Sequence, residues 1–491
     1  MIIDDSYQNL AMKKYLFLLV GLGIFLNSCN SDDDANVPTD IVVQNFMWRA
    51  MNLWYFWQGE VPNLADNRFS SDSEYTEFLQ GTPDPLNFYN SIQFTEDRFS
   101  FSNEDYTTLV NGLNGISKSN GLEFGLVSFA NSDDVFGYVR YIIPNSDAAT
   151  KDIQRGDIFT RVDGQQLTTS NFRDLLFGDN DTYTLGLATI SGTTITDTQE
   201  EVSLTKLEGL TENPVLVANT LDIGGQKIGY LMYNGFTRGF DEELNNAFGQ
   251  FVADNVTDLV LDMRYNPGGS VNSSRLLASM IYGTNTNDLY IRQRWNAKIQ
   301  AQFSASQLED FFAATTNEGS VINTLNLNRV YILATNSSAS ASELVMNGLA
   351  PYVSVIHIGE TTRGKNEFSI TMVDDPDNDY IYNASRENSI NPENSWAIQP
   401  LVGRNENADG FFDYTDGLVP NIILEEDFGN LGVLGNPAEP LLARALQEIT
   451  GITSKASFEP LMTGKVLIGT EMFKPGKDNM FLDKPIKLNF K

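Results

Sequence analysis

The strongest constraint on the fold is an alternation of apolar strands and helices that begins near residue 210. Strands are expected at 228–233, 259–263, 330–334 and 353–358. Helices are expected at 241–254, 274–282, 341–349 and 436–449. Short buried strands that alternate with helices predict βα units and a parallel sheet. We therefore expect an α/β core over residues 208–451.

Two regions of different character precede this core. Residues 41–118 are rich in aromatic side chains, and Trp48, Met51 and Trp54 recur at helical spacing, which predicts a helical region. Residues 119–207 contain short strands separated by Gly, Asn and Asp, which predicts a small α+β module. Its strands are expected at 122–129, 136–143 and 157–162, and its helices at 147–153 and 171–177. The last segment, 452–491, shows no pattern that assigns it.

The N-terminus has the pattern of an export signal. Two lysines precede a short apolar run, and the run ends in Leu-Asn-Ser-Cys at Cys29. This ending resembles the lipobox of bacterial lipoproteins, which implies that residues 1–28 are a signal peptide and that Cys29 is acylated. Residues 29–40 then form an acidic tether. We expect a lipid-anchored protein of the cell envelope, at the outer membrane; an ordinary cleaved signal is the alternative.

Composition excludes several classes of function. Acidic residues outnumber basic ones 64 to 32, and the net charge of −32 argues against a partner that is a nucleic acid. The chain has one cysteine and one histidine, so an internal disulfide, a Cys cluster and a multi-His metal site are all excluded. We expect no cofactor and no metal. His357 lies in an expected strand, and we interpret it as structural.

One chemical signal lies at the turn between an expected strand and an expected helix. Residues 338–343 read Ser-Ala-Ser-Ala-Ser-Glu. Ser340 followed three residues later by Glu343 is a capping-box pattern, which by itself only starts a helix. A serine at this turn also places its hydroxyl beside the free N–H groups of a helix N-terminus, where negative charge is stabilised.

Two further segments follow expected strands and carry glycines. Residues 359–365 read Gly-Glu-Thr-Thr-Arg-Gly-Lys, which places Lys365 at a tight turn. Residues 262–269 read Asp-Met-Arg-Tyr-Asn-Pro-Gly-Gly, and paired glycines after a strand can expose N–H groups to a ligand. Taken singly, Lys365 could be a surface lysine and the glycines a common turn.

Together the three segments resemble the C-terminal processing peptidases, also called tail-specific proteases. That family carries Asp-x-Arg-x-Asn-x-Gly-Gly, then Ser-Ala-Ser-Glu, then Gly-Glu-x-x-x-Gly-Lys, and the spacing from Ser340 to Lys365 is that of the family. The likeness covers roughly residues 120–450 and includes a closing helix near residues 434–441. It implies a multi-domain α/β protein with a core of the crotonase and Clp protease type.

The resemblance also implies roles for individual residues. Ser340 would be the nucleophile and Lys365 its general base, with Glu343 as a supporting residue. The backbone N–H groups of Ala341 and of one of the two glycines, Gly268 or Gly269, would form the oxyanion hole. Many members place a glutamine four residues after the lysine to orient it. This chain has Ser369 at that position. Because a hydroxyl can still hydrogen-bond an amine, we interpret this difference as an adjustment of the lysine's environment and not as a loss of its function.

The region 119–207 resembles the PDZ domain that is inserted in these proteases. Its motifs are Asn-Ser-Asp-Ala-Ala from 145, Arg-Gly-Asp-Ile from 155 and Val-Asp-Gly from 162. The resemblance implies that a loop captures a chain-terminal carboxylate and that the peptide adds as a strand at the sheet edge. The residues of this loop are Gly121, Leu122, Glu123 and Phe124. Glu123 is an unfavourable neighbour for a carboxylate, which predicts weak or altered binding.

These observations predict an envelope lipoprotein and serine endopeptidase that cleaves protein or peptide substrates near their accessible C-termini. The main alternative is a catalytically impaired homologue that binds peptides at the cell surface through its PDZ domain. A glycan-binding lipoprotein is a second alternative, suggested by the aromatic N-terminal region, but it leaves the spacing of Ser340 and Lys365 unexplained.

Overall fold

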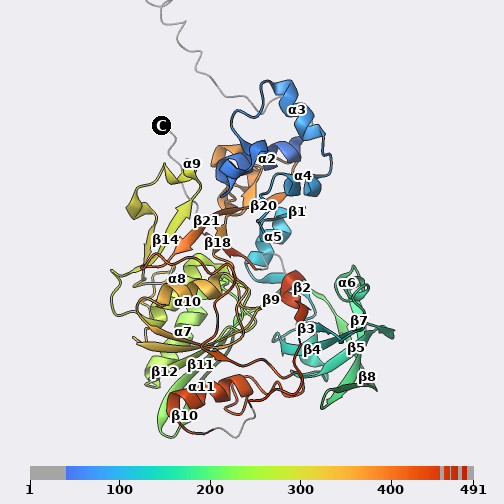
Figure 1. Ribbon diagram of the computed structural model, residues 1–491, viewed down its shortest axis with the longest axis vertical. Helices are drawn as coiled ribbons and strands as arrows, with labels where there is room; N and C mark the ends of the chain where they lie inside the picture. Colours follow the sequence, from blue (N-terminus) through green and yellow to red (C-terminus); the bar gives the residue numbers. More distant parts are fainter. Residues whose placement is uncertain (1–39, 454–457, 465, 474–477, 484–491) are drawn as a thin grey trace, which may run out of the picture.

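The computed structural model describes residues 40–453, 458–464, 466–473 and 478–483 (Figure 1). The expected signal peptide, Cys29 and all but the last residue of the expected tether lie outside the described residues. Within the described ranges, no helix has both the length and the apolar character needed to cross a membrane.

A six-stranded sheet forms the centre of the protein, in the order β10-β11-β12-β16-β17-β22. The strands are β10 (Val215–Ile223), β11 (Gln226–Tyr233), β12 (Asp258–Asp262), β16 (Arg329–Ala334), β17 (Ser354–Gly359) and β22 (Ile422–Ile423). β10 is antiparallel to β11, and the other neighbours are parallel. The four strands expected in the core are β11, β12, β16 and β17, so the predicted βα alternation is confirmed.

Helices cover both faces of this sheet (Figure 1). They are α7 (Asp241–Ala253), α8 (Val271–Ile281), α10 (Ala341–Leu349) and α11 (Pro440–Thr450). Successive residues of β11 point to opposite faces of the sheet. Leu231 packs on the face covered by α7, α8 and α10, whereas Tyr230 packs on the face covered by α11. The helix expected at 436–449 begins only at Pro440, because Glu439 caps it by accepting from the N–H of Leu442.

A second six-stranded sheet lies beside the central one, in the order β13-β24-β18-β21-β14-β15. Its strands are β13 (Gly269–Ser270), β24 (Met480–Phe481), β18 (Glu367–Ser369), β21 (Leu401–Glu406), β14 (Leu289–Trp295) and β15 (Glu309–Phe311), with α9 (Ala297–Gln300) after β14. β24 comes from the C-terminal segment that showed no pattern in the sequence. It is inserted between strands that flank the candidate site residues.

The N-terminal region is mainly helical, as predicted. Its helices are α2 (Val42–Trp54), α3 (Asp72–Gln80), α4 (Pro85–Ser91) and α5 (Tyr106–Leu113). Phe46 and Trp54 of α2 are buried in the same cluster as the helices of the core. The region also contributes strands, because β1 (Phe101–Asn103) joins β20 (Ala397–Gln399) and β19 (Met372–Val373), and β2 (Ile116–Ser119) pairs with β9 (Leu207–Thr211).

A third sheet forms the module between these regions, in the order β23-β3-β4-β5-β7-β8, with β6 paired to β5. Its elements are β23 (Val466–Gly469), β3 (Leu122–Ser128), β4 (Val135–Ile142), β5 (Ile158–Val162), β6 (Gln165–Gln166), α6 (Phe172–Phe177), β7 (Thr182–Ser191) and β8 (Thr194–Thr205). The helix expected at 147–153 is wrong: only a single 3₁₀ turn forms at Ala148–Thr150, closed by the Thr150 N–H donating to Asp147. The predicted fold class, a multi-domain mixture of helix and sheet with a helical N-terminal region, is confirmed.

Candidate active site

Ser340 lies at the turn between β16 and α10. Its backbone has φ 64° and ψ −113°, a conformation that a residue with a Cβ adopts only under strain. The side chain is fully buried, and within the described part of the chain its Oγ has no hydrogen-bond partner. A buried hydroxyl without a partner is costly, so strain and a missing partner at one residue together indicate a functional position.

Glu343 connects the serine turn to the lysine loop. Its carboxylate accepts hydrogen bonds from the backbone N–H groups of Ser340 (2.7 Å), Gly364 (2.6 Å) and Lys365 (2.9 Å). It also accepts one from the hydroxyl of Thr362 (2.5 Å). Burial raises the pKa of Glu343 to about 7, although these donors favour the charged form. The side chain therefore supports both loops at once.

Lys365 follows β17 and is completely buried. Its Nζ donates to the carbonyl oxygen of Asp478 (2.5 Å) and to Oδ1 of Asn479 (3.3 Å), and it lies 5.0 Å from the centre of the Phe99 ring. Burial lowers the pKa of Lys365 to about 8, with the Asp478 carboxylate opposing the shift. An amine with that pKa is available in its neutral form near neutral pH.

The serine and the lysine are brought together by Glu343 and are not hydrogen-bonded to each other in this state. Ser369, at the position where the family often has a glutamine, does not contact Lys365 directly. Its Oγ donates to Oδ1 of Asn479 (2.7 Å). The amide of Asn479 therefore lies between Ser369 and Lys365.

The paired glycines lie against Ser340. Gly268 and Gly269 have φ values of 110° and 134°, which only glycine adopts readily. A Cβ at Gly268 would come within 2.7 Å of both the Cβ of Ser340 and the carbonyl oxygen of Asn479. The N–H of Gly268 donates to the side chain of Asn266 (2.9 Å), whereas the N–H of Gly269 donates to the Asn479 carbonyl (2.6 Å). Of the two glycines, Gly269 presents its N–H to the cleft.

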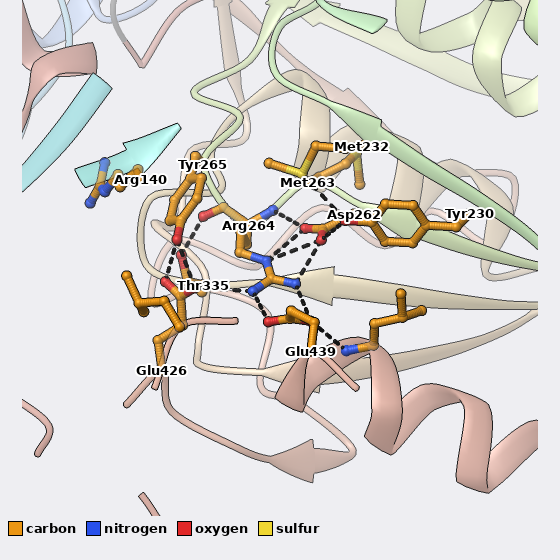
Figure 2. A network of polar contacts seen from close by, with 12 residues as sticks. Arg140, Tyr230, Met232, Asp262, Met263, Arg264, Tyr265, Thr335, Glu426 and Glu439 are labelled. Carbon is orange, nitrogen blue, oxygen red and sulfur yellow. Dashed lines mark hydrogen bonds and ion pairs between the residues drawn. The ribbon is translucent and has the colours of Figure 1, made fainter. Parts of the chain in front are cut away.

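A buried ionic network supports this glycine loop (Figure 2). The guanidinium of Arg264 pairs with Asp262 (2.7 Å), Glu439 (2.7 Å) and Glu426 (3.0 Å). Its backbone carbonyl accepts from the hydroxyl of Thr335 (2.5 Å), at the end of the strand that leads to the serine. Sequence reasoning gave these residues no role, since Glu426 and Glu439 lie 162 and 175 residues from Arg264 in the chain. The signal that could have found Arg264 is a charged residue directly after a fully buried strand.

His357 contacts the backbone rather than the reactive side chains. It lies buried on β17, and its Nε2 is 3.2 Å from the carbonyl oxygen of Ala334. Burial lowers its pKa, so the neutral ring is favoured. This position fits the structural role expected from the sequence.

The residues Gly121, Leu122, Glu123 and Phe124 lie at the start of β3, which is next to the edge strand β23 of the seven-stranded sheet. Leu122 donates its N–H to Oδ1 of Asn120 (3.0 Å), and Glu123 is buried. The residues that line a cavity of about 90 Å³ include Glu123 and the paired glycines Gly268 and Gly269. One residue of the β3 loop and the glycine loop therefore border the same cavity, whereas Ser340 and Lys365 are not among its lining residues.

Comparison with known protein families gives two matches. Residues 227–400 match the pattern of "Peptidase family S41", and residues 42–101 match that of "Peptidase S41 N-terminal domain". The first match contains Ser340, Lys365 and the glycine loop. No curated protein matches the chain.

Two solved structures are similar to most of this chain. A crystal structure from Bacteroides fragilis NCTC 9343, described as an S41 protease, has 25% sequence identity and a TM-score of 0.65, and the match covers 83% of this chain and 97% of that one. The photosystem II D1 C-terminal processing protease has 19% identity and a TM-score of 0.48, with 83% of this chain and 100% of that one covered. The two matches identify residues 42–101 and 227–400 as S41 peptidase domains, and the Bacteroides structure shows that the chain has the fold of an S41 protease.

Proposed function

We propose that this serine peptidase is an endopeptidase in which Ser340 is the nucleophile and neutral Lys365 is the general base. One observation carries the proposal. The carboxylate of Glu343 accepts hydrogen bonds from the backbone N–H groups of both Ser340 and Lys365. Ser340 has a strained backbone and a buried hydroxyl without a partner among the described residues, and the pKa of Lys365 is lowered to about 8. Strain and a lowered lysine pKa are both costs that a purely structural site has no reason to maintain.

The geometry supports an acyl-enzyme mechanism. The hydroxyl of Ser340 attacks the substrate carbonyl carbon, and its proton passes to Nζ of Lys365. The N–H groups of Gly269 and Ala341 stabilise the oxyanion, since the first N–H groups of a helix have no partner within the helix. The C–N bond then breaks, and the leaving amine takes the proton from Lys365. Water then attacks the ester carbonyl and gives a proton to Lys365. The bond from the carbonyl carbon to Oγ breaks, Oγ takes that proton back from the lysine, and the acid product leaves.

Peptide binding is proposed for the seven-stranded sheet, as a PDZ-type domain that directs cleavage towards substrate C-termini. Support comes from β3, which accepts an antiparallel strand along its outer edge, and from the cavity shared with the glycine loop. The buried carboxylate of Glu123 disfavours a chain-terminal carboxylate at this loop. We therefore propose that the strand of the substrate, more than its terminus, is recognised here.

A lipid anchor at Cys29 is proposed on the N-terminal sequence alone. The positive residues, the apolar run and the cysteine at its end support a lipoprotein of the cell envelope, at the outer membrane. The acidic residues after the cysteine would then separate the enzyme from the membrane surface.

Catalysis is tested by incubating the full chain with an unfolded protein and identifying the fragments by mass spectrometry. Ser340→Ala and Lys365→Ala should each lower the cleavage rate by roughly 10²-fold or more. Ser170→Ala and Lys227→Ala change exposed side chains of the same types and should leave the rate unchanged. Cleavage by Ser340→Ala at the wild-type rate would exclude this nucleophile.

A peptide-binding homologue with impaired catalysis is the second candidate. It is favoured by the missing hydrogen bond between Ser340 and Lys365, and by the contact of Ser369 with Asn479 instead of the lysine. A full chain that binds unfolded peptides but leaves them intact under all conditions would favour this alternative.

A further inference from the structure

The C-terminal segment of the chain contacts both of the sites described above. Its described parts, residues 466–473 and 478–483, are called the tail here. The first part lies on the edge of the seven-stranded sheet, and the second part lies in the cleft between the glycine loop and the lysine loop. Sequence analysis assigned nothing to this segment.

The first part of the tail occupies the peptide-binding edge of the sheet. β23 pairs antiparallel with β3, and Val466 and Gly469 lie opposite Val127 and Gly125. The tail therefore runs towards the loop that opens β3, in the direction in which a bound peptide would approach it. At the end of this pairing, the hydroxyl of Thr470 donates to Oε2 of Glu123 (2.6 Å).

Two side chains fix this part of the tail. Glu471 forms a buried ion pair with Arg140 (2.6 Å). The ring of Phe473 stacks on Phe177 of α6, with ring centres 3.4 Å apart. α6 is the helix that follows β6, so the tail contacts a helix of the module as well as a strand. These contacts are specific enough to hold the tail in one register.

The second part of the tail forms a strand inside the cleft. β24 lies between β13 and β18 and is parallel to both. The N–H of Leu482 donates to the carbonyl of Ser369 (3.1 Å), and Ser270 donates to the carboxylate of Asp483. Asn479 and Met480 are 1% and 0% exposed. The tail is therefore fully inserted, with its backbone paired as that of an extended peptide.

The inserted strand forms hydrogen bonds with the groups that the proposed catalysis requires. The carbonyl of Asn479 accepts from the N–H of Gly269, the proposed oxyanion donor (2.6 Å). The carbonyl of Asp478 accepts from Nζ of Lys365 (2.5 Å), and Oδ1 of Asn479 accepts from Ser369. A substrate carbonyl and the Asn479 carbonyl cannot accept from the same N–H in the same place. Binding of substrate therefore requires that the tail leave.

We infer that the tail is a substrate mimic that binds its own enzyme at the sheet edge and in the cleft and thereby inhibits it. The inference rests on the proposed function, because the groups it blocks are those of the proposed mechanism. Attachment to the same chain gives the tail a high effective concentration, so modest contacts suffice to keep it bound. A partner or substrate that displaces the tail would switch the enzyme on.

The main test replaces residues 478–483 of the full chain by a Gly-Ser repeat of equal length. Release of the cleft should raise kcat/KM for an unfolded protein substrate by about 10-fold or more. Leu461→Ala is the matched control, because this residue lies close to the tail in sequence but is 72% exposed, and its activity should stay at the wild-type value. Intact mass shows that every chain assayed still carries its C-terminus. A folded replacement with unchanged or lower activity would overturn the inference.

A second variant covers the case in which the replacement does not fold. Thr470→Val with Phe473→Ala leaves the inserted strand intact and removes the hydrogen bond to Glu123 and the stacking on Phe177. It should also raise kcat/KM, by a smaller factor than the replacement. No increase in this folded double variant would count against the inference.

Binding in trans separates this inference from the proposed function. A labelled peptide with the sequence of residues 466–483 should bind the replaced chain carrying Ser340→Ala, measured by fluorescence anisotropy, and a scrambled peptide should not. If the peptide binds but no form of the chain cleaves protein, the proposed catalysis fails and occupancy of the cleft stands. If the replaced chain cleaves but neither binds the peptide nor is inhibited by it, the tail is not the inhibitor.

Discussion

At the scale of single residues, the site depends on side chains whose surroundings are costly to maintain. Ser340 holds a strained backbone and a buried hydroxyl without a described partner, and Lys365 holds an amine in a dry environment. Glu343 offsets part of this cost by accepting hydrogen bonds from the backbone N–H groups of Ser340 and Lys365. The proposed nucleophile and base are therefore positioned by one buried carboxylate, which itself need not touch the substrate.

Replacement of that carboxylate should destabilise the protein and slow catalysis. In Glu343→Gln one oxygen is lost, and the new amide N–H₂ faces either the donors of Thr362 and Gly364 or the N–H donors of Ser340 and Lys365. A buried donor without an acceptor costs about 1–3 kcal/mol, so we expect a loss of this size in the free energy of unfolding. Urea denaturation measures it, and Glu448→Gln, in a partly exposed helical pair with Arg444, is the control. Equal midpoints for the two variants would contradict the anchoring role.

Turnover should depend on the ionisation of Lys365. Because burial lowers its pKa to about 8, the amine is mostly protonated below that pH and mostly neutral above it, and only the neutral amine can accept the proton of Ser340. We expect kcat to rise with pH through one ionisation near pH 8. Lys365→Arg should not rescue Lys365→Ala, because a guanidinium stays charged.

The matched control for this profile is the one histidine. His357→Ala should keep most of the activity and the same pH profile, because the Nε2 atom of the ring contacts a backbone carbonyl, that of Ala334, and not a reactive side chain. A folded His357→Ala chain without activity, or a profile that is flat around pH 8, would show that Lys365 is not the base.

At the scale of elements, the parallel strands determine where the site lies. β12, β16 and β17 are neighbours, and each ends in a loop that carries one part of the site. The carboxyl ends of parallel strands meet at one edge of a sheet, so the glycine loop, Ser340 and Lys365 converge there. The Arg264 network then fixes the first of these loops. Although burial opposes ionisation, Arg155 and Arg264 lower the pKa of Glu426 to about 2, which keeps that partner charged.

Loss of Arg264 should therefore affect both stability and activity. Arg264→Ala leaves Asp262 and Glu439 buried without their cation, which costs about 3–5 kcal/mol. Without the Arg264 network the glycine loop is no longer held in place, so the molecules that stay folded should also have a lower kcat. Lys227→Ala, in an exposed pair with Asp222, should change the free energy of unfolding by less than about 1 kcal/mol. Thermal unfolding and an activity assay below the melting temperature compare the variants, and similar melting temperatures would refute the network's role.

At the scale of the whole molecule, three sheets meet around the site and the tail links two of them. β23 extends the seven-stranded sheet and β24 extends the sheet beside the core, so one segment contacts both the proposed peptide-binding edge and the proposed catalytic cleft. The inference that the tail inhibits the enzyme therefore couples access to Ser340 to the position of the C-terminal segment. The proposed lipid anchor at Cys29 would place this arrangement at a membrane.

The lipid anchor can be tested on the whole protein. If residues 1–28 are replaced by an ordinary cleavable signal and Cys29→Ser is introduced, the secreted chain should be folded and should fractionate without membranes. The unmodified chain should require detergent for extraction. Membrane association of the altered chain, measured by fractionation and immunoblotting, would remove the support for an anchor at Cys29.

The sequence by itself determined the order of strands and helices in the core, the three loops of the candidate site and the resemblance to a peptidase family. This was possible because each of these features depends on residues that are neighbours in the sequence. They are the strands of five or six residues, the glycines after them, and the serine and glutamate at the start of a helix. Parallel pairing then brings the loops together without further information.

Only the tertiary structure decided how these loops are held and what lies between them. Arg264, Glu426 and Glu439 are far apart in the chain and have no periodic pattern, so their pairing follows from packing alone. The tail strands are two to four residues long and carry too little apolar surface to form alone. They exist because the edges of β3, β13 and β18 offer unpaired backbone groups, a property that no segment of the sequence shows by itself.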